Sequence, residues 1–174
     1  MRIQYHFGKS KQYNLNNILK LNWPKQNTFR ENSFSAMPSG LVPELTVEYW
    51  FKKNDVLNHP NALDQFSVKN TDRFYTIAEG DTSRKSFKRL HRWRFSPTVA
   101  YGNNEVHLHP YYPRRISVSE ALALQSLPTA FDILPDLSLS TKFKMVGNGV
   151  PYLLARGIAI DLHTWLSDFF NTIG

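Results

Sequence analysis

The sequence predicts an α+β fold: a small β-rich region over residues 1–112, followed by short helices and a C-terminal amphipathic helix over residues 113–174. The first 63 residues lack a helical period and are interrupted by four prolines. A Ser-x-x-Glu sequence at Ser117 and apolar residues at helical spacing after Pro151 indicate two helix starts. With 174 residues, of which 41% are hydrophobic, one core is the simplest arrangement.

Short strands are expected in the first region. Leu45–Phe51 and Arg73–Ala78 are rich in β-branched and aromatic residues. Thr98–Tyr101 ends at a Gly-Asn-Asn turn, from which Glu105–Leu108 can return as the second strand of a hairpin.

Two short helices are expected next. Ser117 and Glu120 have the spacing of a capping box, which starts the first helix, and Pro128 ends it. Ser140–Val146 predicts the second helix, which Gly147 ends.

The last segment predicts a long amphipathic helix. Asn148 is a suitable N-cap, and Pro151 suits the first turn, where its missing N–H costs nothing. The apolar face follows at helical spacing: Leu154, Ile158, Leu162, Trp165, Leu166 and Phe169. We expect Phe143 to join Leu154, Ile158, Leu162 and Trp165 in one apolar seam, part of which is exposed in the free chain.

Positive charge is concentrated in the first region. Residues 1–131 carry 18 Lys and Arg against 10 Asp and Glu, whereas residues 132–174 carry 3 against 4. Residues 84–94 hold six basic side chains and no acid, a pattern that favours contact with nucleic-acid phosphates. The alternative is a solvated face whose Phe87, Leu90 and Trp93 anchor the core. The candidate DNA-binding residues are Arg84, Lys85, Lys88, Arg89, Arg92 and Arg94.

Two further patterns have a structural and a functional interpretation. His107 and His109 share one face of a strand and can begin a metal site, but no third ligand is spaced to complete it, so two strand-end histidines are favoured. Gly147–Pro151 (GNGVP) offers N–H groups and an amide to a polar ligand, although Gly-Asn-Gly is also an ordinary C-cap and turn.

Read together, two blocks resemble the carboxy-terminal end of the DNA (cytosine-5) methyltransferases. The family's Arg-x-Leu-Thr-x-Arg-Glu block, with its following Gln-x-Phe-Pro, is matched by Arg114, Ser117, Glu120, Gln125 and Pro128. Its last block, Gly-Asn-Ala/Ser-Val-Pro, is matched by Gly147, Asn148, Val150 and Pro151. Upstream, residues 95–99 are similar to the family's Pro-Ser-Pro-Thr-Ile element. Three positions depart from the pattern: Ser119, Leu127 and Gly149.

The resemblance implies a division of roles within the chain. Residues 1–112 would be the target-recognition region, which contacts double-stranded DNA. Residues 113–174 would close the enzyme, with the last helix packed on the catalytic α/β domain of a partner. Asn148, Gly149 and Val150 would line one side of the S-adenosylmethionine site. Structural roles fall to Arg114, Ser117 and Glu120.

The chain contains no cysteine, which excludes a thiolate nucleophile, Cys-ligated zinc and disulfides within these residues. The family's Pro-Cys-Gln, Phe-x-Gly-x-Gly and Glu-Asn-Val blocks are absent as well. We therefore assign no catalytic residue and no metal, and expect methyl transfer of the restriction-modification type to need a catalytic chain that carries the Cys.

Two alternatives stay open: a non-enzymatic DNA-binding or regulatory module derived from such an enzyme, and a remnant or recombinant piece of a longer one. With no apolar run of membrane-spanning length and no apolar signal-peptide core, a soluble cytoplasmic protein is expected.

Overall fold

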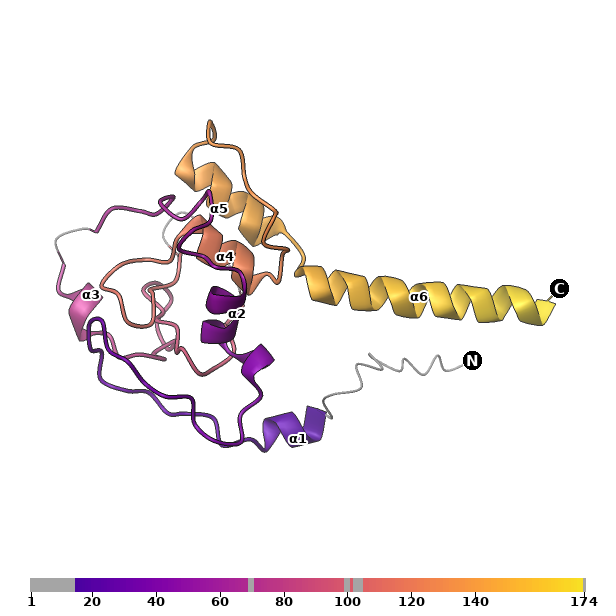
Figure 1. Ribbon diagram of the computed structural model, residues 1–174, viewed down its shortest axis with the longest axis horizontal. Helices are drawn as coiled ribbons and strands as arrows, with labels where there is room; N and C mark the ends of the chain where they lie inside the picture. The colour runs from indigo at the N-terminus through magenta and orange to yellow at the C-terminus, as the bar shows by residue number, and fades with distance from the viewer. Residues whose placement is uncertain (1–14, 69–70, 99–100, 102–104, 174) are drawn as a thin grey trace.

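The computed structural model describes residues 15–68, 71–98, 101 and 105–173. Helix α4 adjoins both α2 and α5 in the body of the molecule, whereas α6 projects from it as one long rod (Figure 1). In chain order the elements are α1 (Leu15–Leu19), the 3-10 turn η1 (Pro43–Leu45), α2 (Val47–Lys53), α3 (Arg73–Thr76), α4 (Val118–Leu124), α5 (Leu139–Asn148) and α6 (Tyr152–Ile173).

The expected α+β class with a β-rich first region is wrong. Within the described residues, β pairing is limited to three isolated bridges: Asn27 with Glu79, Arg89 with Leu108, and Leu108 with Arg115. The chain between the helices is irregular coil, so most of its buried polar groups must be satisfied without a sheet.

Leu45–Phe51, expected as a strand, lies largely in α2. Thr46 starts this helix, since its Oγ1 accepts a hydrogen bond from the Tyr49 amide at 3.4 Å. Val47 and Phe51, one helical turn apart, are both buried on the same face. Lys52 and Lys53 in the last turn match the negative end of the helix dipole. These helix signals outweigh the β propensity of the side chains.

Arg73–Ala78 is also not a strand. It contains the one-turn helix α3, followed by the extended residue Ile77. Phe74 and Ile77 are buried and pack with Leu108 in a small apolar cluster. Their spacing of three residues puts both on one side of a helical turn, whereas a strand would place them on opposite faces.

The expected hairpin of Thr98–Tyr101 with Glu105–Leu108 falls partly outside the described residues, which exclude 99–100 and 102–104. Within 105–108, Leu108 pairs with the basic segment. The Leu108 amide donates to the Lys88 carbonyl at 2.8 Å, and the Leu90 amide donates to the Leu108 carbonyl at 3.1 Å.

The main core lies between α2, α4 and α5. α4 is buried along nearly its whole length, and the rings of Phe66 and Phe143 stack at 5.3 Å. Gly147 brings α5 close to the coil, because a Cβ on it would lie 3.1 Å from the Tyr101 amide nitrogen. The helical residues of this core are Val47, Phe51, Val118, Ala121, Leu122, Ala123, Phe143 and Val146.

A buried arginine donates hydrogen bonds to backbone carbonyls at the centre of the coil. Arg89 is 0% exposed, and its guanidinium donates to four backbone carbonyls. Burial lowers the pKa of Arg89 to about 10, which leaves it charged at neutral pH. One side chain therefore joins segments that a sheet would otherwise connect. The carbonyls belong to Phe74, Ile77, His109 and Tyr112.

A stability measurement tests this role. Arg89→Met leaves several buried carbonyls without a donor, so it should lower the free energy of unfolding by at least about 3 kcal/mol. Arg84→Met is the matched control, since the Arg84 side chain is 60% exposed, and should change that free energy by less than about 0.5 kcal/mol. Urea denaturation followed by tryptophan fluorescence measures both. Equal stabilities of the two variants would contradict the role of Arg89.

Candidate cofactor turn and DNA-facing surface

The start of α4 is built on a buried carboxylate. Ser117 Oγ accepts from the Glu120 amide and Glu120 Oε2 accepts from the Ser117 amide at 2.8 Å, so the predicted capping box is confirmed. Arg114 donates to both oxygens of Glu120, at 2.8 and 2.7 Å. Glu120 is 1% exposed, and a charge at that depth requires such paired donors. This cluster fixes α4 to the coil before it.

Both histidines of the sequence pattern are buried, and His109 lies beside this cluster. His109 Nδ1 accepts from the Tyr111 and Tyr112 amides, and its Nε2 lies 3.5 Å from Glu120 Oε1. Burial holds the pKa of His109 well below its usual value and lowers that of His107 to about 4, so both rings are neutral at neutral pH. Among the described residues, no group of three His, Cys, Asp or Glu is placed to hold a metal ion.

The end of α4 holds the start of α6. Gln125 Nε2 donates to the Val146 carbonyl at 3.0 Å, and its own carbonyl accepts from the Tyr152 amide at 2.9 Å. Ser126 Oγ accepts from the Leu153 amide at 3.0 Å. The two family-like blocks are therefore joined by hydrogen bonds on either side of the turn between α5 and α6. Sequence reasoning gave Ser126 no role, because a cap supplied from 27 residues away leaves no local pattern.

This arrangement corrects two details of the sequence prediction. Asn148 was expected to cap the last helix, but it is the final residue of α5, which continues past Gly147. The first helix ends at Leu124, before the expected stop at Pro128. Ser126 has a φ of 54°, a left-handed backbone that is uncommon for serine and that accompanies its capping role.

The candidate cofactor residues form an exposed edge. Asn148, Gly149 and Val150 are all exposed, and within the described residues no hydrogen bond engages the side-chain amide of Asn148. A Cβ on Gly149 would lie 3.3 Å from the Val146 carbonyl oxygen, a close contact that a small shift can relieve. A free amide and a short turn fit the polar part of S-adenosylmethionine. These three residues can supply one side of such a site, but they do not enclose the whole of S-adenosylmethionine.

The basic segment divides into exposed and buried residues. Arg84 and Lys85 are exposed, whereas Lys88 and Arg94 are half-buried. Arg89 and Arg92 are buried, so these two do not lie on a DNA-facing surface in this structure. Arg92 Nε donates to Glu79 Oε1 at 2.8 Å and its Nη2 donates to Oε2 at 3.0 Å.

The positions of the aromatic and aliphatic side chains of this segment indicate that they pack within the protein rather than stack on bases. Leu90 and Trp93 are buried, in agreement with the alternative that they anchor the core. Phe87 packs edge-on against Phe74 at 5.9 Å, with the guanidinium of Arg115 4.7 Å from its ring centre. The exposed basic side chains are therefore carried by an anchored loop.

With the two blocks joined in one unit, comparison with known proteins identifies the class. Residues 4–164 match the model of the C-5 cytosine-specific DNA methylase family. The chain belongs to this family, whose members use S-adenosylmethionine.

Three relatives are type II enzymes, one of them putative. The chain is 52% identical to the type II methyltransferase M.NmeDI of Neisseria meningitidis serogroup C over 154 residues, which are 88% of this chain and 36% of the relative. It is 31% identical to the type II methylase M.HgiDII of Herpetosiphon aurantiacus over 94 residues, 50% of this chain and 26% of the relative. It is 57% identical to a putative type II methyltransferase of Oceanobacillus iheyensis over 53 residues, which are 30% of this chain and 11% of the relative. The chain thus spans less than two fifths of each relative.

None of the helices in the described part of the chain combines the length and hydropathy that crossing a membrane requires.

The cap on α6 gives a specific prediction. Ser126→Ala removes the acceptor of the Leu153 amide, so this amide should exchange its hydrogen faster and the free energy of unfolding should fall by about 1 kcal/mol. Ser126→Asn keeps an acceptor and tolerates a left-handed backbone, so its effect should be smaller. Ser167→Ala, in the C-terminal part of α6, is the serine control. Hydrogen exchange measured at single amides tests this prediction. An unchanged exchange rate of the Leu153 amide in Ser126→Ala would disprove the cap.

Proposed function

We propose that this chain is the DNA-recognition and cofactor-site-completing part of a DNA cytosine-C5 methyltransferase of the restriction-modification type, and that a separate catalytic chain completes the enzyme. When bound, S-adenosylmethionine supplies the methyl group. The thiolate that attacks cytosine must come from outside these 174 residues, which contain no cysteine. The family supports the reaction, and the exposed face of α6 is the observation that supports the division between chains.

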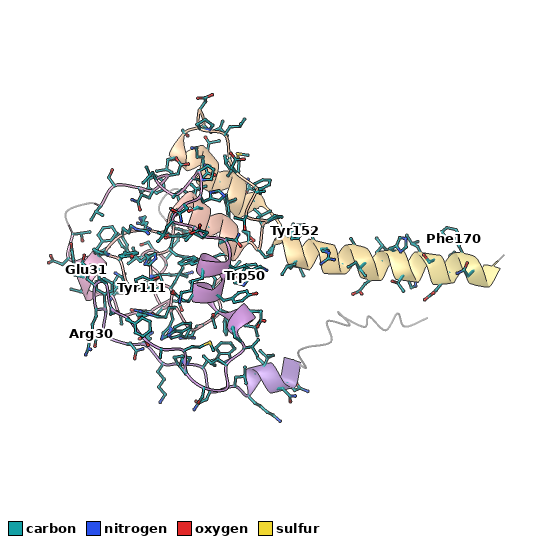
Figure 2. All side chains as sticks on the ribbon, in the orientation of Figure 1. Arg30, Glu31, Trp50, Tyr111, Tyr152 and Phe170 are labelled. Carbon is teal, nitrogen blue, oxygen red and sulfur yellow. The ribbon has the colours of Figure 1, made fainter. Side chains whose placement is uncertain are left out.

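α6 presents an apolar face that nothing in the described chain covers. Its side chains stand clear of the body from Tyr152 to Phe170 (Figure 2). Leu154, Ile158, Leu162, Trp165 and Phe169 recur on one face, yet they are 42% to 54% exposed. Phe143, which was expected to share this seam, lies in the core instead and is 2% exposed.

Burial of this face would contribute much to an assembly. Fully burying one large apolar side chain stabilises by about 1.5–3 kcal/mol relative to full exposure, so completing the burial of these five half-exposed side chains contributes roughly half of that for each. A helix without tertiary packing is marginally stable in water, and α6 is held by hydrogen bonds at its first turn. We place the catalytic α/β domain of the partner against this face, which brings the turn at Asn148, Gly149 and Val150 to the edge of the partner's cofactor site.

The DNA-facing part of the proposal rests on the loop between Asp81 and Arg89. The Arg89 amide closes its base by donating to the Asp81 carbonyl at 2.8 Å. Arg84, Lys85 and Lys88 lie within this loop, and Arg94 follows it. With the buried pair Arg89 and Arg92 set aside, these four cations form the surface that we propose meets double-stranded DNA. The target cytosine would then be flipped into the partner's pocket.

Two isoleucines of α6 provide a matched test of the partner surface. Ile158 and Ile160 are both 52% exposed, but two residues correspond to about 200° around a helix, so they face different sides. Ile158→Asp should weaken binding to the catalytic chain at least about tenfold, because it places a carboxylate in the apolar interface. Ile160→Asp should bind like the unmodified chain. Isothermal titration against the chain that carries the Pro-Cys-Gln block measures both.

The outcomes separate the candidate functions. Equal binding by both variants would place the interface elsewhere and contradict the role of the α6 face. No binding by the unmodified chain, together with DNA binding, would favour the non-enzymatic DNA-binding or regulatory module.

A further inference from the structure

A small pocket opens beside the proposed DNA-facing surface. It has a volume of about 50 Å³ and is lined by Gly80, Thr82, His91, Arg94, Phe95 and Pro97. A single water needs about 10–15 Å³ of such cavity space, so the pocket has room for the few oxygens of one phosphate group. Its lining comes from two segments, 80–82 and 91–97, which lie on either side of the basic loop.

Arg94 gives the pocket its charge. In the described part of the chain no carboxylate forms an ion pair with Arg94, whose guanidinium lies 6.0 Å from the Phe95 ring centre. The nearby acids are engaged elsewhere and are not part of the lining. Glu79 accepts from Arg92 through both oxygens, and Asp81 Oδ1 accepts from the Ser83 amide at 3.0 Å.

Gly80 and His91 form a tightly packed, neutral part of the lining. Gly80 has a φ of 85°, and a Cβ on it would lie 3.1 Å from the His91 ring, so only glycine fits this turn. His91 Nδ1 accepts from the Trp93 amide at 3.0 Å, and Nε2 lies 3.3 Å from Asn27 Nδ2. Burial lowers the pKa of His91, against the opposing effect of Glu79, so the ring is uncharged at neutral pH.

Thr82 adds a hydroxyl. No hydrogen bond to another described residue engages its side chain, and it lies in the lining together with Arg94. Thr82 and Arg94 thus contribute a hydroxyl-bearing and a guanidinium-bearing residue to the lining of one pocket, and such donors suit the non-bridging oxygens of a phosphodiester.

We propose that this pocket, with Arg94 and Thr82 as its donors, seats one backbone phosphate of the DNA and thereby fixes the position of the basic loop on the duplex. The proposal rests on the proposed DNA-binding role of the chain and adds a defined contact to it. Arg94 would then hold a single phosphate. Arg84 and Lys85, which are exposed and line no part of this pocket, would interact with the overall negative charge of the duplex.

Phosphate-ethylation interference on a short DNA duplex tests the seat. Ethylation of the seated phosphate should block binding of the unmodified chain, and this single position should disappear from the interference pattern of Arg94→Gln. The slope of log affinity against log salt should fall by about 0.9 in Arg94→Gln and stay nearly unchanged in Arg94→Lys, which keeps the charge. Thr82→Val should weaken binding several-fold without changing the slope.

Two comparisons complete the design. Arg156→Gln, on the projecting helix α6 (Figure 1), removes the same charge far from the pocket and should leave the interference pattern unaltered. In a nuclear magnetic resonance titration, the duplex should shift the Gly80 and Thr82 amide signals at concentrations far below those at which inorganic phosphate does so.

The results distinguish the seat from the wider proposal. DNA binding with identical interference patterns in the unmodified chain and Arg94→Gln would overturn the phosphate seat and leave the DNA role intact. Equal responses to inorganic phosphate and duplex would assign the pocket to free phosphate and also overturn the seat. Absence of DNA binding by the unmodified chain would overturn both.

Discussion

The structure depends on how an irregular chain satisfies its buried backbone carbonyls. In the described residues β pairing is reduced to single bridges, and Arg89 donates to four carbonyls from segments on both sides of it. A buried guanidinium carries five donors in a fixed plane, which makes such a junction possible for one side chain. The loop that carries Arg84, Lys85 and Lys88 begins beside this junction. Its position on the surface therefore follows from the burial of Arg89.

A second polar junction connects the coil to the helices. Glu120 binds Arg114 and caps α4, and at the other end of α4 Gln125 and Ser126 hold the first turn of α6. The family-like blocks are thus two ends of one rigid unit. The direction of α6, and with it the place of its apolar face, is set by that unit rather than by packing along the helix.

The sequence predicted the features that depend on neighbouring residues. The capping box at Ser117 and the apolar face of α6 follow from local spacing, and both are present. Leu45–Phe51 was mispredicted because aromatic and β-branched composition was weighted above the cap at Thr46. The burial of Arg89 and Arg92 could not be predicted for a different reason. Their partners are carbonyls, a serine and a carboxylate from distant segments, and no sequence pattern identifies which cations such groups will bury. The role of Ser126 likewise depends on a tertiary contact.

A methyl-transfer assay tests the central claim, that this chain completes an enzyme whose nucleophile lies elsewhere. Labelled S-adenosylmethionine and duplex DNA are incubated with this chain, with the chain that carries the Pro-Cys-Gln block, and with both. Label should enter cytosine C5 when both chains are present and in neither single incubation. Transfer by this chain alone, or transfer by the catalytic chain that is unaffected by adding this one, would contradict the claim.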